Sequence, residues 1–71
     1  MDVEEVSPLG KIDAPYGKTI EFQHVRYDND FVMIRLRIKE GKRFTTIDLD
    51  PGSASNWLEI MQPWVVEHRP A

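Results

Sequence analysis

Four aspartates are the side chains that could bind a metal ion. Asp28 and Asp30 flank Asn29 in one polar turn, and Asp48 and Asp50 lie at the end of a run of alternating apolar residues. Carboxylate oxygens are the ligands that Ca²⁺ and Mg²⁺ prefer, but the Asp-Asn-Asp turn lacks the spaced ligands and the closing glutamate of a calcium-binding loop. Solvated turn carboxylates and a helix cap explain the four residues more simply. No metal site is expected.

Nucleophilic catalysis would need a serine, a histidine and an acid in suitable positions. The histidines are His24, on an expected core face, and His68, near the C-terminus, while Ser7, Ser53 and Ser55 fit turns or helix caps. The chain has no cysteine, and its four glycines stand alone at turns, so thiolate zinc sites and a phosphate-binding glycine loop are excluded. Neither a triad nor a zinc site can be assembled. We expect no catalytic residue, no cofactor and no enzymatic activity.

Length and charge limit the class of protein further. The chain has 71 residues and a formal net charge of −3. This size predicts one small domain, and the acidic balance argues against double-stranded nucleic acid as the main partner. No apolar run approaches the length of a membrane span, and the acidic start differs from a signal peptide. We expect a cytoplasmic protein with no membrane partner.

Three runs of alternating apolar residues predict the elements that position these side chains. They are Thr19–Tyr27, Phe31–Lys39 and Lys42–Leu49, joined by Asp28-Asn29-Asp30 and by Glu40-Gly41. Side chains in a strand alternate between the two faces, and Asn, Asp and Gly suit tight turns. The three runs therefore predict a three-stranded antiparallel meander.

The lengths of the two turns fix the expected register. A three-residue first turn places Phe22 opposite Leu36. A two-residue loop at Glu40-Gly41 places Leu36 opposite Thr45. In both pairs the apolar faces coincide, and a slip of one residue would reverse them.

The N-terminal part of the chain is less regular. Residues 1–8 are polar and acidic, and we expect them to form a flexible N-terminus outside a single domain spanning residues 9–71. The turn Ala14-Pro15-Tyr16-Gly17 has proline and glycine at favourable positions. It suggests a short fourth strand at Leu9–Asp13, with Leu9 opposite Phe22.

A helix is expected after the third run. Asp50 is a good cap, and Pro51 is favoured at the first helical position. Pro63 removes a backbone donor, so a kink or a break is expected there. An α+β fold follows, with one C-terminal helix packed on one face of the sheet. The two tryptophans of this helix could line a ligand pocket, but a core stripe explains them better. The expected helical stripe comprises Ala54, Trp57, Leu58, Met61, Trp64 and Val65.

One helix covers one face, so the other face of the sheet is the predicted interaction surface. Exposed apolar clusters often mark contact sites, although the N-terminal segment could also fold over this one. We expect a non-catalytic protein-interaction module that forms a homodimer or a small subunit of a larger assembly. The face expected to carry the contact comprises Val25, Tyr27, Phe31, Met33, Arg35, Arg37 and Phe44.

The alternative function is weak binding of single-stranded nucleic acid. Basic side chains gather at one end of the sheet, and interleaved basic and aromatic residues can stack single strands. The plan of strands followed by a helix is similar to that of the single-strand-binding transcriptional coactivators. A solvated strand face with a Glu21–Arg37 ion pair is the simpler explanation. The basic end comprises Lys18, Lys39, Lys42 and Arg43, and the binding residues would be Arg35, Arg37, Lys39, Lys42 and Phe44.

A wider resemblance covers most of the chain. The stretch from Ala14-Pro15-Tyr16-Gly17 through Arg43-Phe44-Thr45 to Asp50-Pro51 resembles small bacterial proteins of unknown function. This resemblance implies no activity, ligand or site residue.

Overall fold

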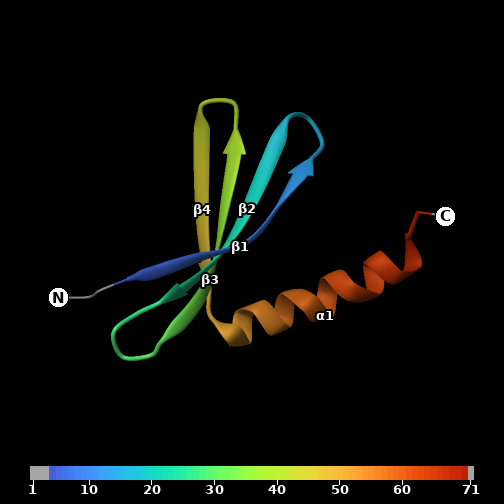
Figure 1. The fold of residues 1–71 in the computed structure, drawn as a ribbon. Helices are drawn as coiled ribbons and strands as arrows, with labels where there is room; N and C mark the ends of the chain where they lie inside the picture. The colour runs from blue at the N-terminus through green and yellow to red at the C-terminus, as the bar shows by residue number, and fades with distance from the viewer. Residues whose placement is uncertain (1–3, 71) are drawn as a thin grey trace.

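Four strands and one helix follow one another along the chain. The computed structural model describes residues 4–70; residues 1–3, part of the N-terminus expected to be flexible, lie outside that range. The strands form one antiparallel sheet in the order β1-β2-β3-β4 (Figure 1). This confirms the predicted α+β class, including the fourth, N-terminal strand. The elements are β1 (Glu5–Ala14), β2 (Lys18–Arg26), β3 (Val32–Glu40), β4 (Arg43–Leu49) and α1 (Pro51–Glu67).

The hairpin of β2 and β3 has the predicted register. Phe22 lies opposite Leu36, and the N–H of Tyr27 donates a hydrogen bond of 2.9 Å to the carbonyl of Phe31. The three-residue turn ends at Asp30, whose φ is 62°. Asp tolerates this left-handed conformation better than most residues, which explains why the turn has this length.

The hairpin of β3 and β4 differs from its predicted register by two residues. Leu36 lies opposite Ile47, where Thr45 was expected. The loop consists of Gly41 and Lys42, and Gly41 has a φ of 62°. Glycine at the first central position is the signature of a type II′ turn, whereas the expected loop placed it second. A shift of two residues keeps every side chain on its predicted face.

Strand β1 begins at Glu5, four residues earlier than the strand that the sequence predicted at Leu9. Part of the segment expected to lie outside the domain therefore pairs with β2. The register shifts between Pro8 and Gly10, so Gly10 lies opposite Phe22 in place of Leu9. Proline and a bulge are both tolerated in β1 because it is an edge strand.

The helix follows β4 almost without a connection. Asp50 alone separates Leu49 from Pro51, and its backbone is extended, with φ −74° and ψ 166°. It occupies the predicted cap position, although its side chain makes no capping hydrogen bond. The helix continues through Pro63 to Glu67, so the proline does not end it.

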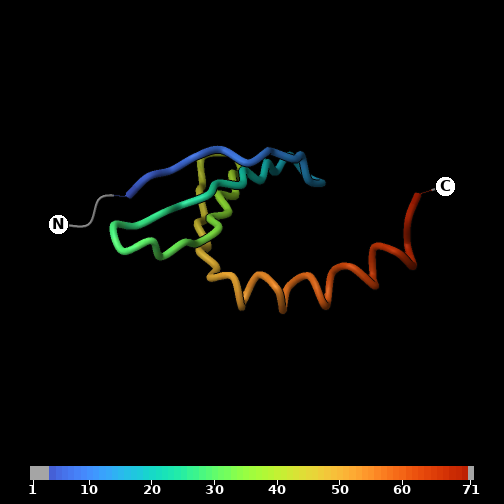
Figure 2. The backbone as a smooth tube through the Cα atoms, turned by 60° about the horizontal axis from the view of Figure 1, so that its bottom comes forward, coloured from blue at the N-terminus to red at the C-terminus, as the bar shows by residue number. Residues whose placement is uncertain are grey.

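The helix covers only a small part of the sheet, in contrast to the predicted packing across one face. It contacts β3 and β4 and buries none of its own residues. Figures 1 and 2 show it leaving the end of β4 and extending well beyond the side of the sheet. The single linking residue explains this path, because helices that return across a sheet usually follow a longer loop.

The core is correspondingly small. Among residues 4–70, only Val25, with 0% of its surface exposed, and Leu36, with 4%, are buried hydrophobic residues. Their positions in the strands place them on opposite faces of the sheet. The radius of gyration is 14.2 Å, against about 11 Å for a compact domain of this length. The chain is an extended structure with a thin core.

Candidate interaction surface

The distal half of the helix carries a row of exposed apolar side chains. We call residues 60–67 the helical arm. Ile60 is 75% exposed and Trp64 is 61% exposed. Both follow Trp57 at spacings of three and seven residues, so all three lie on one side of the helix. The other exposed large apolar residues of the arm are Met61, Val65 and Val66.

An apolar groove of about 200 Å³ lies where the root of the helix meets the sheet. A second hollow continues it past Ile34 and Leu49 to the half-buried His24 and the exposed Leu9. A third hollow continues it along the helix from Trp57. Because the three share lining residues, they form one continuous apolar region, which we call the helix-side surface. The central groove is lined by Phe22, Ile34, Leu36, Leu49, Ala54, Trp57 and Leu58.

The end of the arm is held by His68, the residue that follows it. The backbone N–H of His68 donates hydrogen bonds to the carbonyls of Trp64 and Val65. The His68 ring stacks on the Trp64 ring, with 4.7 Å between their centroids. The spacing of four residues between His68 and Trp64 is the signal by which sequence analysis could have found this contact.

On the opposite face, the predicted interaction surface is partly closed. Val25 is completely buried and therefore unavailable to a partner. It lies between Met33 on β3 and Val6 on β1, each directly opposite it in the sheet. The sequence missed this cover because β1 begins earlier than expected and brings Val6 alongside.

Arg35, a second residue of that predicted surface, is occupied by ion pairs within the chain. Its guanidinium contacts both carboxylate oxygens of Asp48, at 2.8 and 3.1 Å, and one oxygen of Glu4 at 2.6 Å. Hydrogen bonding to Asp48 and Glu4 raises the pKa of Arg35. The same bond to Arg35 lowers the pKa of Asp48. Only 19% of the Arg35 side chain is exposed. Its ion pairs therefore stabilise the sheet.

Phe44 is the single aromatic residue of β4, and 57% of its surface is exposed. The guanidinium carbon of Arg37 lies 5.2 Å from the ring centroid, and the ammonium of Lys39 lies 6.0 Å from it. Arg37 also forms the predicted cross-strand ion pair with Glu21, at 3.5 Å. Two of the four cations expected to bind a nucleic acid, Arg37 and Lys39, therefore already interact within the chain.

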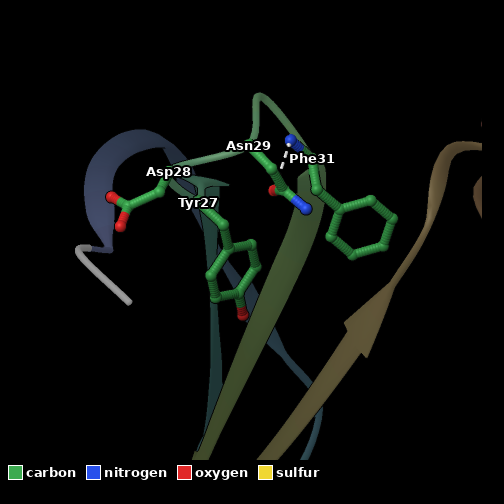
Figure 3. A pocket seen from close by; sticks show the side chains of 4 residues that line it. All are labelled: Tyr27, Asp28, Asn29 and Phe31. Carbon is green, nitrogen blue, oxygen red and sulfur yellow. Dashed lines mark hydrogen bonds between the residues drawn. The ribbon is translucent and has the colours of Figure 1, made fainter. Parts of the chain in front are cut away.

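The first hairpin carries the aromatic pair at the acidic end of the sheet. The rings of Tyr27 and Phe31 are 6.0 Å apart and tilted by 32°. The Asn29 side-chain oxygen accepts a hydrogen bond of 3.1 Å from the Phe31 N–H (Figure 3). These residues and Asp28 line a shallow hollow. This hydrogen bond holds the turn in place, so the hollow is explained by the folding of the hairpin and does not indicate a ligand site.

The predicted basic end of the sheet contains an acidic residue. The Lys18 ammonium lies 3.3 Å from a Glu40 carboxylate oxygen. Arg43 lies directly opposite Glu40 in the sheet, and Lys42 occupies the adjoining turn. Glu40 reduces the positive potential that this end would present to a phosphate.

The described part of the chain lacks a metal-binding cluster and a membrane-spanning helix. Residues 4–70 contain no group of three His, Asp or Glu side chains that could hold a metal ion. Within the same residues, no helix is both long and apolar enough to span a bilayer.

A family model matches most of the chain. The model of a family of unknown function, DUF6967, matches residues 3–67. Neither a curated protein nor a solved structure is significantly similar to the chain.

Proposed function

The chain belongs to DUF6967, a family of unknown function, and we propose that it is a non-catalytic protein-interaction module that binds its partner through the helix-side surface. The observation that carries this proposal is the helical arm, whose apolar row faces solvent from Ile60 to Val66. Burying apolar surface is the main favourable contribution to protein association. Contiguous exposed apolar side chains are typical of contact surfaces.

The small core supports the same conclusion. A chain with so few buried side chains gains little stability on its own, and partners commonly complete such folds. The helix-side surface offers a groove beside the root of the helix and a projecting arm beyond it. A partner that covered both would bury Trp57 and Trp64, and tryptophans are frequent anchors of protein interfaces.

The opposite face is a weaker candidate for the contact. Val25 is buried, and Arg35 is held by Asp48 and Glu4. A partner on this face would have to displace ion pairs that already satisfy the Arg35 guanidinium. The helix side is therefore the proposed interaction surface, in place of the face predicted from the sequence.

The proposal is tested by the native mass of the protein in an extract of the cells that produce it. The wild-type chain is expected above its monomer mass of 8.3 kDa. Ile60→Asp places a charge in the apolar row and is expected to return the chain to the monomer mass. Glu59→Gln, on the polar side of the helix, is the matched control and is expected to leave the assembly intact.

Two results would contradict the proposal. One is a wild-type chain that runs at its monomer mass in the extract. The other is an assembly that tolerates Ile60→Asp. Thermal unfolding of both purified variants checks that the sheet is retained, because neither position lies in the core.

A second candidate function is binding of single-stranded nucleic acid, favoured by the position of Phe44 between two cations. A base could stack on its exposed ring while Arg37 and Lys39 contact phosphates. The Glu21–Arg37 ion pair and the overall negative charge work against this function. It ranks second for those reasons.

A further inference from the structure

The accessible surface of the chain is larger than its mass predicts. It amounts to 5956 Å², whereas a compact monomer of 8.3 kDa has about 4,600 Å². The excess of about 1,400 Å² is comparable with the surface that one partner buries in a large, stable dimer. The amount of surface left open is therefore enough for a stable interface with one further protein chain.

The helix-side surface has two parts of similar length, the arm and the open face of the sheet. The arm projects with Ile60 and Trp64 outward, while the sheet beside the root of the helix is open. The apolar rows of that sheet face, from Ile34 to Ile38, extend over about 13 Å. The helical arm, from Ile60 to Glu67, extends over about 10 Å. An arm of this length fits the uncovered sheet of another copy.

The charges of the two parts are complementary. The helix has Glu59 and Glu67 as its only charged residues. Arg43 lies on the same face of the sheet as Ile47, at the end distant from the root of the helix. Glu67 follows Ile60 by seven residues and so lies in line with it. An arm placed along the sheet would bring the Glu67 carboxylate towards this end, where the two cations Lys18 and Arg43 outnumber the one carboxylate of Glu40.

Building on the proposed function, we infer that the partner is a second copy of this chain and that the two copies exchange helical arms. Each arm lies over the helix-side face of the other sheet, with Ile60 and Trp64 against Phe22 and Ile47. The contact is two-fold symmetric, since the arm of each copy meets the sheet of the other. Two arms would be buried in one closed interface, which leaves neither apolar row exposed.

The first test is sedimentation equilibrium of the purified full-length chain. A dimer is expected, with Ile60→Asp raising its dissociation constant at least about tenfold. Glu59→Gln is expected to leave the constant unchanged. A wild-type monomer at every concentration up to about 100 µM would overturn the inference.

The second test identifies which surfaces meet. The chain has no cysteine, so single cysteines can be introduced without background pairing. A copy with Ile60→Cys mixed with a copy with Ile47→Cys is expected to give a covalent heterodimer under mild oxidation. Two results would overturn the arm exchange. One is a bond only between two Ile60→Cys copies. The other is a bond only within a monomer that carries both changes, because the arm would then close on its own sheet.

The outcome also separates this inference from the proposed function. If the purified chain is a monomer but its native assembly is lost in Ile60→Asp, the partner is a different protein and the interaction module stands. If the chain is a monomer and Ile60→Asp changes nothing in the extract, both fail.

Discussion

Arg35 and Asp48 form a two-point ion pair directly across β3 and β4, with contacts of 2.8 and 3.1 Å. The pair exists because the β3–β4 hairpin turns at Gly41-Lys42, which brings Arg35 opposite Asp48. In the register expected from the sequence, Arg35 faced Thr46. The turn residue therefore decides which charges meet on this face.

The first prediction concerns the pH dependence of stability. Hydrogen bonding to Arg35 lowers the pKa of Asp48 in the folded chain, so the contribution of Asp48 is complete above its unfolded pKa of about 3.9. This contribution is lost as the pH falls through the lower folded pKa. At pH 7, Asp48→Asn is expected to reduce the free energy of unfolding by about 1 kcal/mol. Chemical denaturation of both chains from pH 7 to pH 2 should show the difference shrinking below about pH 4. A constant difference would contradict the assignment.

The second prediction compares a core position with an arm position. Val25→Ala removes two methyl groups from the one side chain that is completely buried among residues 4–70, and it is expected to cost about 2 kcal/mol. Ile60→Ala, at a side chain that is 75% exposed, is expected to change monomer stability by less than about 0.5 kcal/mol. Denaturation at low protein concentration measures both. Equal losses would show that the arm packs within its own chain.

The third prediction tests the turn that sets the register. Gly41 has a φ of 62°, where an alanine side chain costs about 1 kcal/mol or more. Gly41→Ala is therefore expected to lower the thermal midpoint. Gly10→Ala is the control, because Gly10 lies outside the left-handed region and a Cβ there meets nothing within 4 Å. Equal decreases at the two positions would contradict the claim that the left-handed conformation of Gly41 causes the loss of stability.

The fourth prediction tests the nucleic-acid alternative. Labelled single-stranded oligonucleotides are titrated at low and moderate salt with the wild-type chain and with Phe44→Ala. If the alternative is correct, binding weakens as salt rises and falls by about 1–3 kcal/mol when the stacking ring is lost. Absence of binding at low salt rejects it, as does binding that Phe44→Ala leaves unchanged.

The sequence predicted the parts of the fold that depend on local patterns. Alternation and the length of the Asp28–Asp30 turn were sufficient to place Phe22 opposite Leu36, and this pairing is confirmed. The turn at Gly41 was assigned one residue too early, because both placements keep the apolar faces together. Only the left-handed backbone conformation of Gly41 distinguishes the two placements of the turn.

The parts that depend on distant contacts were not predictable in the same way. The ion pair of Glu4 with Arg35 joins residues far apart in sequence, and no local pattern indicates it. The incomplete cover of the sheet follows from the path of α1, which the single residue Asp50 directs. That short connection was visible in the sequence, where the third run ends at Leu49 and Pro51 follows. It could have indicated that the helix leaves the sheet.

The two edge strands of the sheet differ in their ability to pair with another strand, and this difference limits how far the sheet could be extended by further chains. On β1, Pro8 lacks a backbone donor and the bulge beside it interrupts regular pairing. Strand β4 has neither a proline nor a bulge, and its outer edge can accept another strand. A sheet that can be extended on only one side stops growing after one pairing, because the joined edges are used up. Edge-to-edge association of this chain would therefore stop at two copies, because the irregular edge of β1 disfavours the repeated pairing that forms fibres.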